Sequence, residues 1–288
     1  MPLPELTPCS GRADRGSRAD VEIRLASLPD AVAELRARPT GIAVSEREAR
    51  FIWDDAGAFV VRDGREILVQ PHPGADERLV RLGILGPAMA ALLQQLGIVA
   101  LHASAVRMDD AIIAFLGASG AGKSTLAAAF HRCGAPVVTD DTLAVRLHDG
   151  AVLATPGFAH LRLWPDSVTA LGGDPGALAR CEPDREKRVY PTARERIAHE
   201  PLPLRRLYVL ADGDTPAVER LSPAESFLAL VANSYGIDWM HDVSGRADFL
   251  ARAEIARRVP VRRLRRPDDL ALLSWTVACV EDDLARDA

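Results

Sequence analysis

The sequence of 288 residues is poor in cysteine, and its four cysteines lie far apart without a CxxC pair. A chain of this length does not depend on disulfide bonds for a stable core, so this spacing indicates a reduced protein. The N-terminus is polar and of mixed charge, and it lacks the apolar segment of a signal peptide. We therefore expect a cytoplasmic location.

Long apolar runs and an excess of positive charge are also missing. The longest apolar stretch, residues 82–101, is interrupted by Pro87, Gln94 and Gln95 and is too broken to span a bilayer. The formal net charge is −5, and the one basic run, at 262–266, is short. These features argue against nucleic acid and membrane surfaces as partners. A small phosphate-bearing ligand needs only local positive charge and is not excluded.

The patterns along the chain predict three parts. Residues 1–19 are rich in Pro, Ser, Arg and Gly and are expected to form a flexible tail. Residues 20–97 are expected to form a small β-rich subdomain plus a helix. The segments VEIRLA, ARFIW, AFVVRD and EILVQ are strand-like and separated by turn signals, and 76–96 has helical spacing. Residues 98–288 are expected to form the larger domain of a mixed α/β (α+β) protein.

In the larger domain, an apolar strand at 111–116 precedes a glycine-rich loop and a helix at 123–133. A strand at 100–106 is joined to 111–116 by a turn at 109–110, and another strand is expected to end at Asp140. We expect a hairpin at 145–154, loops over 166–197 and a strand at 204–210. Helices are predicted at 223–235, 244–258 and 267–286.

The loop at 117–124 has the sequence GASGAGKS, which fits G-x-x-x-x-G-K-[ST]. Its glycines let backbone N–H groups converge on phosphate oxygens, and the helix presents its positive N-terminus to the same anion. Lys123 is expected to bridge the outer phosphates of ATP, and the Ser124 hydroxyl to ligate Mg²⁺. An ordinary glycine-rich turn is rejected because an apolar strand and an amphipathic helix flank the motif. The predicted nucleotide-binding residues are Gly117, Ala118, Ser119, Gly120, Ala121, Gly122, Lys123, Ser124 and Thr125.

Two acids and a histidine flank this loop in sequence. Asp140 and Asp141 follow VVT at the expected end of the strand after the loop's helix. Adjacent residues on an extended chain point to opposite sides, so one acid is suited to bind Mg²⁺ and the other to accept a proton from an attacking hydroxyl. A solvated turn is the alternative. His102 opens the strand that pairs with 111–116, and it has either a structural role or a place near the phosphates.

The segments LHASAV, FLGASGAGKSTLAAAF and APVVTDDTLAV resemble the catalytic core of the HPr kinase/phosphorylase family. More narrowly, they are similar to the shorter HPr-kinase-related proteins, which include serine kinases that tailor lasso peptides. His102 lies 21 positions before Lys123, and Asp141 lies 18 positions after it. The resemblance implies a P-loop kinase core of the HPr kinase/phosphoenolpyruvate carboxykinase type, carried by residues 98–288, with a small N-terminal β-rich subdomain and C-terminal helices.

The resemblance also implies a role for each matched residue. His102 and Lys123 hold and polarise the phosphates, and Ser124 ligates Mg²⁺. Asp141 is the general base toward a serine hydroxyl, and Asp140 is the neighbouring acid in the metal shell. The implied activity is an ATP-dependent serine kinase acting on a peptide or small protein, and the resemblance allows a homo-oligomer.

Part of the family pattern is missing downstream of Asp141. A glycine-rich signature associated with a metal-binding Glu and with dephosphorylation is replaced by FAHLRLWPDS, where Asp166 is the candidate acid. We therefore carry over the kinase activity and not the reverse phosphorylase activity. Lys187 and Arg188, in an expected loop, are candidates to close over the triphosphate, and a solvated charged loop is the alternative.

Two other functions compete with the kinase interpretation. A nucleotide-dependent switch or ATPase without a phosphorylated acceptor would share the glycine-rich loop, although the intact Lys123, Ser124, Asp140 and Asp141 argue against a degenerate site. Phosphoenolpyruvate carboxykinases are distantly similar, but this chain is much shorter and shows no second set of metal ligands. The sequence names no acceptor.

Overall fold

The structure is a computed structural model that describes residues 3, 20–38, 40–158, 160–192, 200–236 and 245–286. Apart from residue 3, the predicted tail at 1–19 lies outside these residues, as does the predicted first residue of the helix at 244–258. The protein is a mixed α/β structure. No helix within the described ranges is long and apolar enough to cross a membrane. The chain divides into two compact units, Met1–Ala100 with Tyr235–Phe249 and Leu101–Ser234 with Leu250–Ala288.

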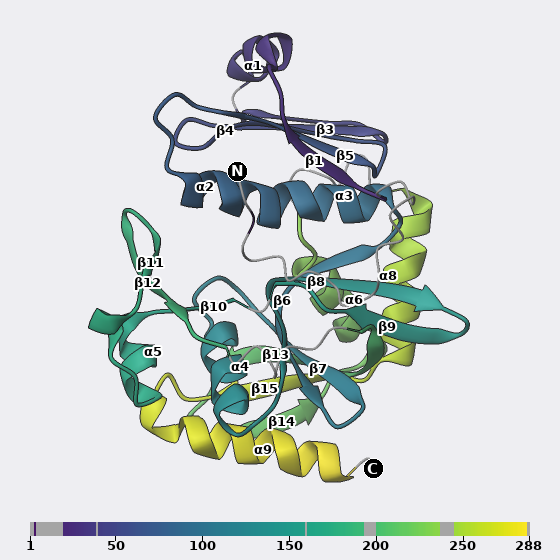
Figure 1. Cartoon of the computed structure of the whole chain (residues 1–288). Helices are drawn as coiled ribbons and strands as arrows, with labels where there is room; N and C mark the ends of the chain where they lie inside the picture. The colour runs from purple at the N-terminus through teal and green to yellow at the C-terminus, as the bar shows by residue number, and fades with distance from the viewer. Residues whose placement is uncertain are drawn as a thin grey trace. The chain divides into compact units, whose positions relative to one another are not determined.

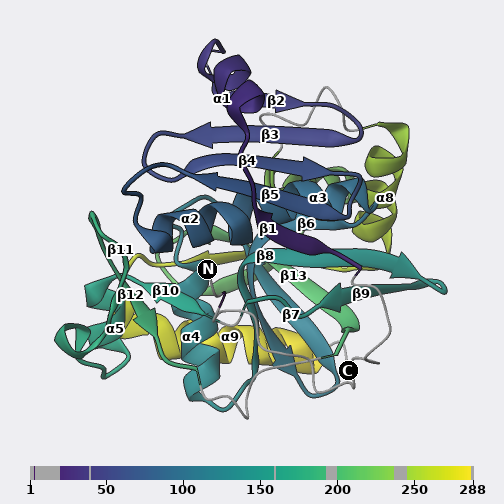
Figure 2. The same ribbon diagram turned by 45° about the horizontal axis from the view of Figure 1, so that its top comes forward.

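The first unit is built on a sheet with the strand order β1-β5-β4-β3-β2 (Figure 2). Strands β2 to β5 form an antiparallel meander, whereas β1 pairs in parallel with β5. The elements are β1 (Glu22–Leu25), α1 (Pro29–Arg36), β2 (Ile42–Val44), β3 (Glu48–Trp53), β4 (Gly57–Arg62), β5 (Glu66–Pro71), α2 (Glu77–Gly83), the π-helical turn η1 (Ile84–Ala88) and α3 (Met89–Gln95).

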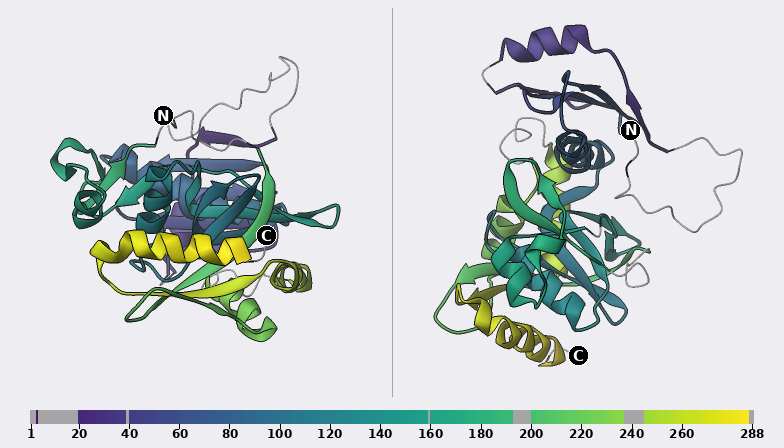
Figure 3. Two further views of the ribbon diagram at one scale, coloured as in Figure 1. Left: turned by 90° about the horizontal axis from the view of Figure 1, so that it is seen from below. Right: turned by 60° about the vertical axis from the view of Figure 1, so that its left-hand side comes forward.

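Helices cover both faces of this sheet (Figure 3, right). Helix α1 lies on one face, where Ala31 and Leu35 are buried, and the sequence interpretation, which placed only strands between 21 and 70, missed it. Its two buried apolar positions are too few to produce a clear helical period. The predicted helix at 76–96 is present as α2, η1 and α3 on the other face. It begins at an Asp76 cap and widens to a π-helical turn around Pro87, which has no N–H to donate.

The second unit contains a sheet with the strand order β14-β15-β13-β7-β6-β8-β9 (Figure 1). Strands β7, β13 and β15 are parallel, and β6, β9 and β14 run antiparallel to neighbours in the sheet. From β6 onward the elements are β6 (Val99–Met108), β7 (Ala111–Leu116), α4 (Lys123–Arg132), β8 (Val137–His148), β9 (Ala151–Thr155), β10 (Leu161–Leu163), α5 (Pro165–Ala170), the 3₁₀ turn η2 (Pro175–Ala177), β11 (Arg180–Glu182), β12 (Arg185–Tyr190), β13 (Leu202–Asp212), β14 (Ala217–Arg220), α6 (Pro223–Ala232), α8 (Arg246–Arg258), β15 (Val261–Arg266), the 3₁₀ turn η4 (Leu270–Leu272) and α9 (Leu273–Arg286).

Two predictions for this unit are wrong. Strand β8 does not end at Asp140 but continues as one strand to His148, because Leu143 and Val145 after the acids are buried and residues 144–148 pair with β9. Within the predicted loops at 166–197, the described residues form a small sheet of order β10-β12-β11 and the short helix α5. Charged residues dominate β12, so its sequence lacks the apolar alternation by which strands are recognised.

An apolar core holds α4 against the sheet. The ring of Phe115 on β7 lies 5.6 Å from that of Phe130 on α4 and 6.1 Å from that of Tyr208 on β13. All three side chains are buried in one cluster, which also includes Val280 and Leu284 of α9. Aromatic pairs at such distances stabilise packing beyond the area that they bury. The core therefore fixes the start of α4 relative to the ends of the parallel strands.

Candidate phosphoryl-transfer site

A glycine loop, residues 117–124, connects β7 to α4 at the end of the sheet. Gly120 and Gly122 have φ values of 87° and 86°, in the left-handed region that side chains with a Cβ rarely adopt. Helix α4 begins immediately afterwards at Lys123, so the loop's backbone wraps the positive end of the helix dipole. A backbone of this shape is suited to hold an anion.

Lys123 turns back over this loop. Its Nζ donates hydrogen bonds to the carbonyl oxygens of Gly117, at 2.7 Å, and Ala118, at 3.0 Å. Burial lowers the pKa of Lys123 to about 8, although the negative charges of Asp140 and Asp141 oppose the shift. At pH 7 the side chain is therefore mainly a cation, held beside the loop's backbone.

The two adjacent acids converge on one side of β8 rather than pointing to opposite sides. Asp140 accepts hydrogen bonds from the Ser104 hydroxyl, at 2.5 Å, and from the backbone N–H of Arg162, at 2.9 Å. The Arg162 guanidinium pairs with Asp141 at 3.1 Å, so one residue of β10 contacts both carboxylates. The two side chains do not point to opposite faces of the strand, because Asp141 has a φ of 122°, outside the extended region of a regular strand.

Asp141 also contacts the histidine predicted from the sequence. Its Oδ1 lies 3.0 Å from His102 Nδ1. His102 and Ser104 are two residues apart on β6, and side chains at that spacing share one face of a strand. The spacing within LHASAV therefore explains why one strand supplies partners to both acids.

The charge of Asp141 is stabilised by these neighbours. Burial on its own would raise the pKa of the carboxyl group. The positive charge of Arg162 and the hydrogen bond from His102 outweigh burial and hold the pKa of Asp141 below its usual value. Asp141 is therefore a carboxylate at neutral pH.

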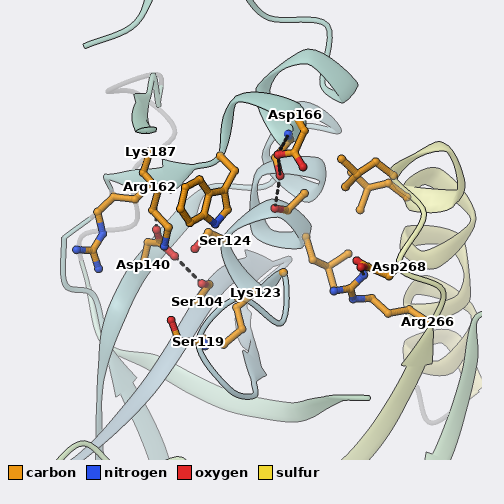
Figure 4. Close-up of a pocket in the computed structure, with 18 of the residues that line it drawn as sticks. Ser104, Ser119, Lys123, Ser124, Asp140, Arg162, Asp166, Lys187, Arg266 and Asp268 are labelled. Carbon is orange, nitrogen blue, oxygen red and sulfur yellow. Dashed lines mark hydrogen bonds and ion pairs between the residues drawn. The ribbon is translucent and has the colours of Figure 1, made fainter. Parts of the chain in front are cut away.

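These side chains open into one cavity of about 500 Å³ (Figure 4). Most of the residues predicted for the site line it, namely His102, Ser119, Gly120, Gly122, Lys123, Ser124, Thr125, Asp140 and Asp141. The other three loop residues contribute carbonyl groups: Gly117 and Ala118 accept from Lys123, and Ala121 accepts from Arg266. The structure thus brings the predicted residues of three separate segments together.

Of the three weaker candidates, Asp166 and Lys187 line the cavity, and Arg188 makes its hydrogen bonds elsewhere. Asp166 lines the cavity, and its Oδ1 accepts the N–H of Ser167 at 2.7 Å in the first turn of α5. Lys187 lines it as well, with Nζ 5.5 Å from the centre of the Trp164 ring, within the range of a cation–π contact. Arg188 instead donates to the Pro175 carbonyl at 3.1 Å.

Sequence reasoning missed Arg162 and Arg266, which also line the cavity. Arg162 reaches the acids only because β10 pairs with β12 beside them, a tertiary arrangement without a local signal. Arg266 belongs to the basic run at 262–266, which was interpreted as lying around a strand end but forms β15. The sequence did offer one signal for Arg266. Side chains two residues apart on a strand share a face, so Arg266 lies on the same face of β15 as the buried Leu264.

The cavity offers oxygen donors for a divalent cation. Across the described ranges, no cluster of three or more His, Cys, Asp or Glu side chains is arranged as a metal site. Mg²⁺ does not require such a cluster, because it is commonly held by one or two protein oxygens together with substrate phosphates and water. The Ser124 hydroxyl and the Asp140 carboxylate, which line the same cavity, fit this kind of site.

Comparisons with known proteins add little to this geometry. No family model matches the chain. No curated protein matches it either. Among solved structures, the chain is similar to the HPr(Ser) kinase/phosphatase from Coxiella burnetii, with a TM-score of 0.36 and 12% identity over 65% of this chain and 91% of that one. That protein is a weak structural neighbour, and we infer neither activity nor ligand from it.

Proposed function

We propose that this chain is an ATP-dependent kinase that transfers the γ-phosphoryl group of ATP to a hydroxyl, that of a serine in a peptide or small protein. One observation carries the proposal: a single cavity is lined by the glycine loop with Lys123 and by the paired acids Asp140 and Asp141. A phosphate-binding loop alone is common to switches, ATPases and kinases. Transfer to a hydroxyl requires in addition a positioned group that accepts the hydroxyl proton, and an acid beside the loop can fill that role.

In this proposal, the glycine loop and Lys123 hold the phosphates. The loop supplies backbone N–H groups and the helix dipole of α4, and Lys123 supplies a cation held beside them. Ser124 and Asp140 would hold Mg²⁺, which when bound neutralises charge on the phosphate oxygens. Ser104 keeps Asp140 oriented through the 2.5 Å hydrogen bond. These groups act mainly by positioning and by electrostatic stabilisation.

The His102–Asp141 pair acts at the acceptor side. As the serine oxygen attacks the γ-phosphorus, the bond to the β-phosphate oxygen breaks, ADP leaves and the hydroxyl proton passes to the Asp141 carboxylate, which is the base in this scheme. His102 orients that carboxylate through its contact with Oδ1. Because Arg162 and His102 lower the pKa of Asp141, its carboxylate is a weak base, and positioning of the hydroxyl supplies the rest of its effect.

A narrower acceptor follows from the sequence resemblance alone. It suggests the C-terminal serine of a lasso-peptide precursor as the substrate. A peptide that ends in serine therefore belongs among the substrates tested.

The test uses γ-labelled ATP with Mg²⁺ and a panel of serine-containing peptides. We expect label on serine of at least one peptide. Release of free phosphate alone would favour the switch or ATPase interpretation, and the proposal would be wrong. Asp141→Asn should bind ATP as the wild type does but transfer at a rate lower by about a hundredfold or more. Asp110→Asn, in the exposed turn between β6 and β7, is the matched control and should transfer normally.

A further inference from the structure

The proposed reaction uses only one end of the cavity. Across Lys123 and Ser124 from Asp140 and Arg162, the cavity continues toward Arg266 (Figure 4). The residues that line this second end come from the C-terminus of β15, the turn η4 and the first turns of α4 and α9, and they are Leu126, Arg266, Pro267, Asp268, Asp269, Leu270, Leu273 and Thr276. We call this set the distal end.

Arg266 forms one wall of the distal end and is fixed to the glycine loop. Its NH2 group donates to the carbonyl of Ala121, and its NH1 group donates to the carbonyl of Pro267 at 3.1 Å. A Cβ added to Gly122 would lie 2.5 Å from NH2, so the guanidinium packs directly on the loop's backbone. Its side chain is only 15% exposed. The planar group is thus immobilised at the edge of the site.

The charge of Arg266 is weakly compensated by protein groups. Within the part of the chain that the structure describes, its one ion pair joins NH1 to Asp268 Oδ1 at 3.9 Å, and the Asp268 side chain is 98% exposed. Such a pair contributes little in water. A planar cation held by carbonyl groups is well suited to stack on a flat ring, because guanidinium groups are weakly hydrated.

Apolar side chains form part of the other walls. Leu270 and Leu273 are half-buried, and Leu126 and Thr276 are buried. The Thr276 hydroxyl is already used, since it donates to the Leu272 carbonyl at 3.2 Å. The distal end therefore offers apolar surface, which a triphosphate does not bind, beside a loop shaped for phosphates.

We propose that the distal end is the nucleobase subsite, where a purine ring lies between the Arg266 guanidinium and the side chains of Leu270 and Leu273. The inference rests on the proposed function, since the base belongs to the ATP whose phosphates the glycine loop holds. Asp269 lines the same end, where its Oδ1 accepts the N–H of Ala271 at 2.9 Å, and its second oxygen is offered to the exocyclic amino group of the purine. In this arrangement the base of the nucleotide lies beside α9, and its γ-phosphate lies beside Asp140 and Asp141.

Comparing ATP with inorganic tripolyphosphate, both with Mg²⁺, separates the base from the phosphates. By calorimetry, the wild type should bind ATP about tenfold more tightly than tripolyphosphate. Leu270→Ser should remove most of that preference and leave tripolyphosphate affinity unchanged. Arg266→Lys, which keeps the charge but not the planar group, should weaken ATP binding more than tripolyphosphate binding. Arg263→Ala is the matched control, because Arg263 lies on the same strand but pairs with Glu219 and Glu225.

The outcomes distinguish this inference from the proposed function. Equal affinity of the wild type for ATP and tripolyphosphate would overturn the nucleobase subsite and leave the phosphate site intact. Equal weakening of both ligands by Leu270→Ser and Arg266→Lys would overturn it too. Failure of the wild type to bind either ligand would contradict the proposed function itself. Thermal unfolding of each variant confirms that the protein compared is folded.

Discussion

The carboxylate of Asp141 lies 3.0 Å from the imidazole of His102, with Oδ1 facing Nδ1. The two residues come from different strands, β8 and β6, and both line the cavity beside the glycine loop. A carboxylate in this position orients the imidazole ring. The pair therefore depends on each partner, and on Arg162, which occupies the other oxygen of Asp141.

Replacing Arg162 tests the electrostatic balance at Asp141. The folded-state pKa of Asp141 lies below the usual aspartate value of 3.8, so its ionisation stabilises the fold above that pH, and this stability is lost as pH falls through the folded pKa. In Arg162→Met, burial of Asp141 is less well compensated and its pKa should rise. We expect a loss of about 2 kcal/mol at neutral pH, less than for a fully buried pair, and acid unfolding at a higher pH. Urea titrations at several pH values measure both effects, and Arg146→Met, on an exposed part of β8, is the control.

The lowered pKa of Lys123, about 8 against the usual lysine value of 10.5, predicts two pH effects. Between these values the unfolded chain binds more protons than the folded one, so stability should rise with pH across that window. Phosphate binding needs the protonated side chain, so ATP affinity should fall by about tenfold between about pH 7 and pH 9. In Lys123→Arg the side chain stays charged over this pH range, so the fall in ATP affinity should disappear. An equal drop in that variant would show that another group titrates.

Gly122 and Gly134 form a matched pair for the glycine loop. Both have positive φ, 86° and 106°, so alanine at either position costs about 1 kcal/mol or more in backbone strain. Only at Gly122 does the added Cβ collide with another group, Arg266 NH2 at 2.5 Å, whereas at Gly134 no atom lies within 4 Å. We expect both variants to lose stability and only Gly122→Ala to lose ATP affinity. Calorimetric titration at a temperature where both remain folded decides this.

Asp283 anchors α9 to the sheet. It accepts hydrogen bonds from Arg206 NH1, at 2.6 Å, and from the Tyr208 hydroxyl, at 2.8 Å, and the Arg206 side chain is only 3% exposed. Asp283→Ala would leave that buried guanidinium without its carboxylate and should cost about 3–5 kcal/mol in denaturant unfolding. Asp282→Ala, on the exposed side of the same helix, should change stability little.

The parts of the fold that follow local patterns could be predicted. Residues 111–116 form a strand with the predicted bounds, and the turn at 109–110 is confirmed, because a fully apolar run between turn signals has few alternatives. The helix after the glycine loop ends at Arg132, one residue before its predicted end. The helix α1 and the strand β12 were missed, since one is short and the other is charged.

The candidate site could be predicted only where a motif marks it. The glycine loop, His102, Asp140 and Asp141 were found because each stands next to a strong strand or helix signal. Arg162 and Arg266 become neighbours of the loop through strand pairing between distant segments. Their positions depend on the register of these pairings, and the local sequence offers no signal for Arg162 and only the alternation around Leu264 for Arg266.

The backbone of Asp141 also restricts which residues can replace it. With φ at 122°, the position favours glycine for steric reasons and tolerates aspartate or asparagine better than bulkier or branched residues. Chemistry and conformation therefore select different residues there: the proposed reaction requires a carboxylate, and relief of strain favours glycine. Among relatives that keep this backbone, glycine at this position would mark a lineage that lacks the proposed reaction and retains the scaffold.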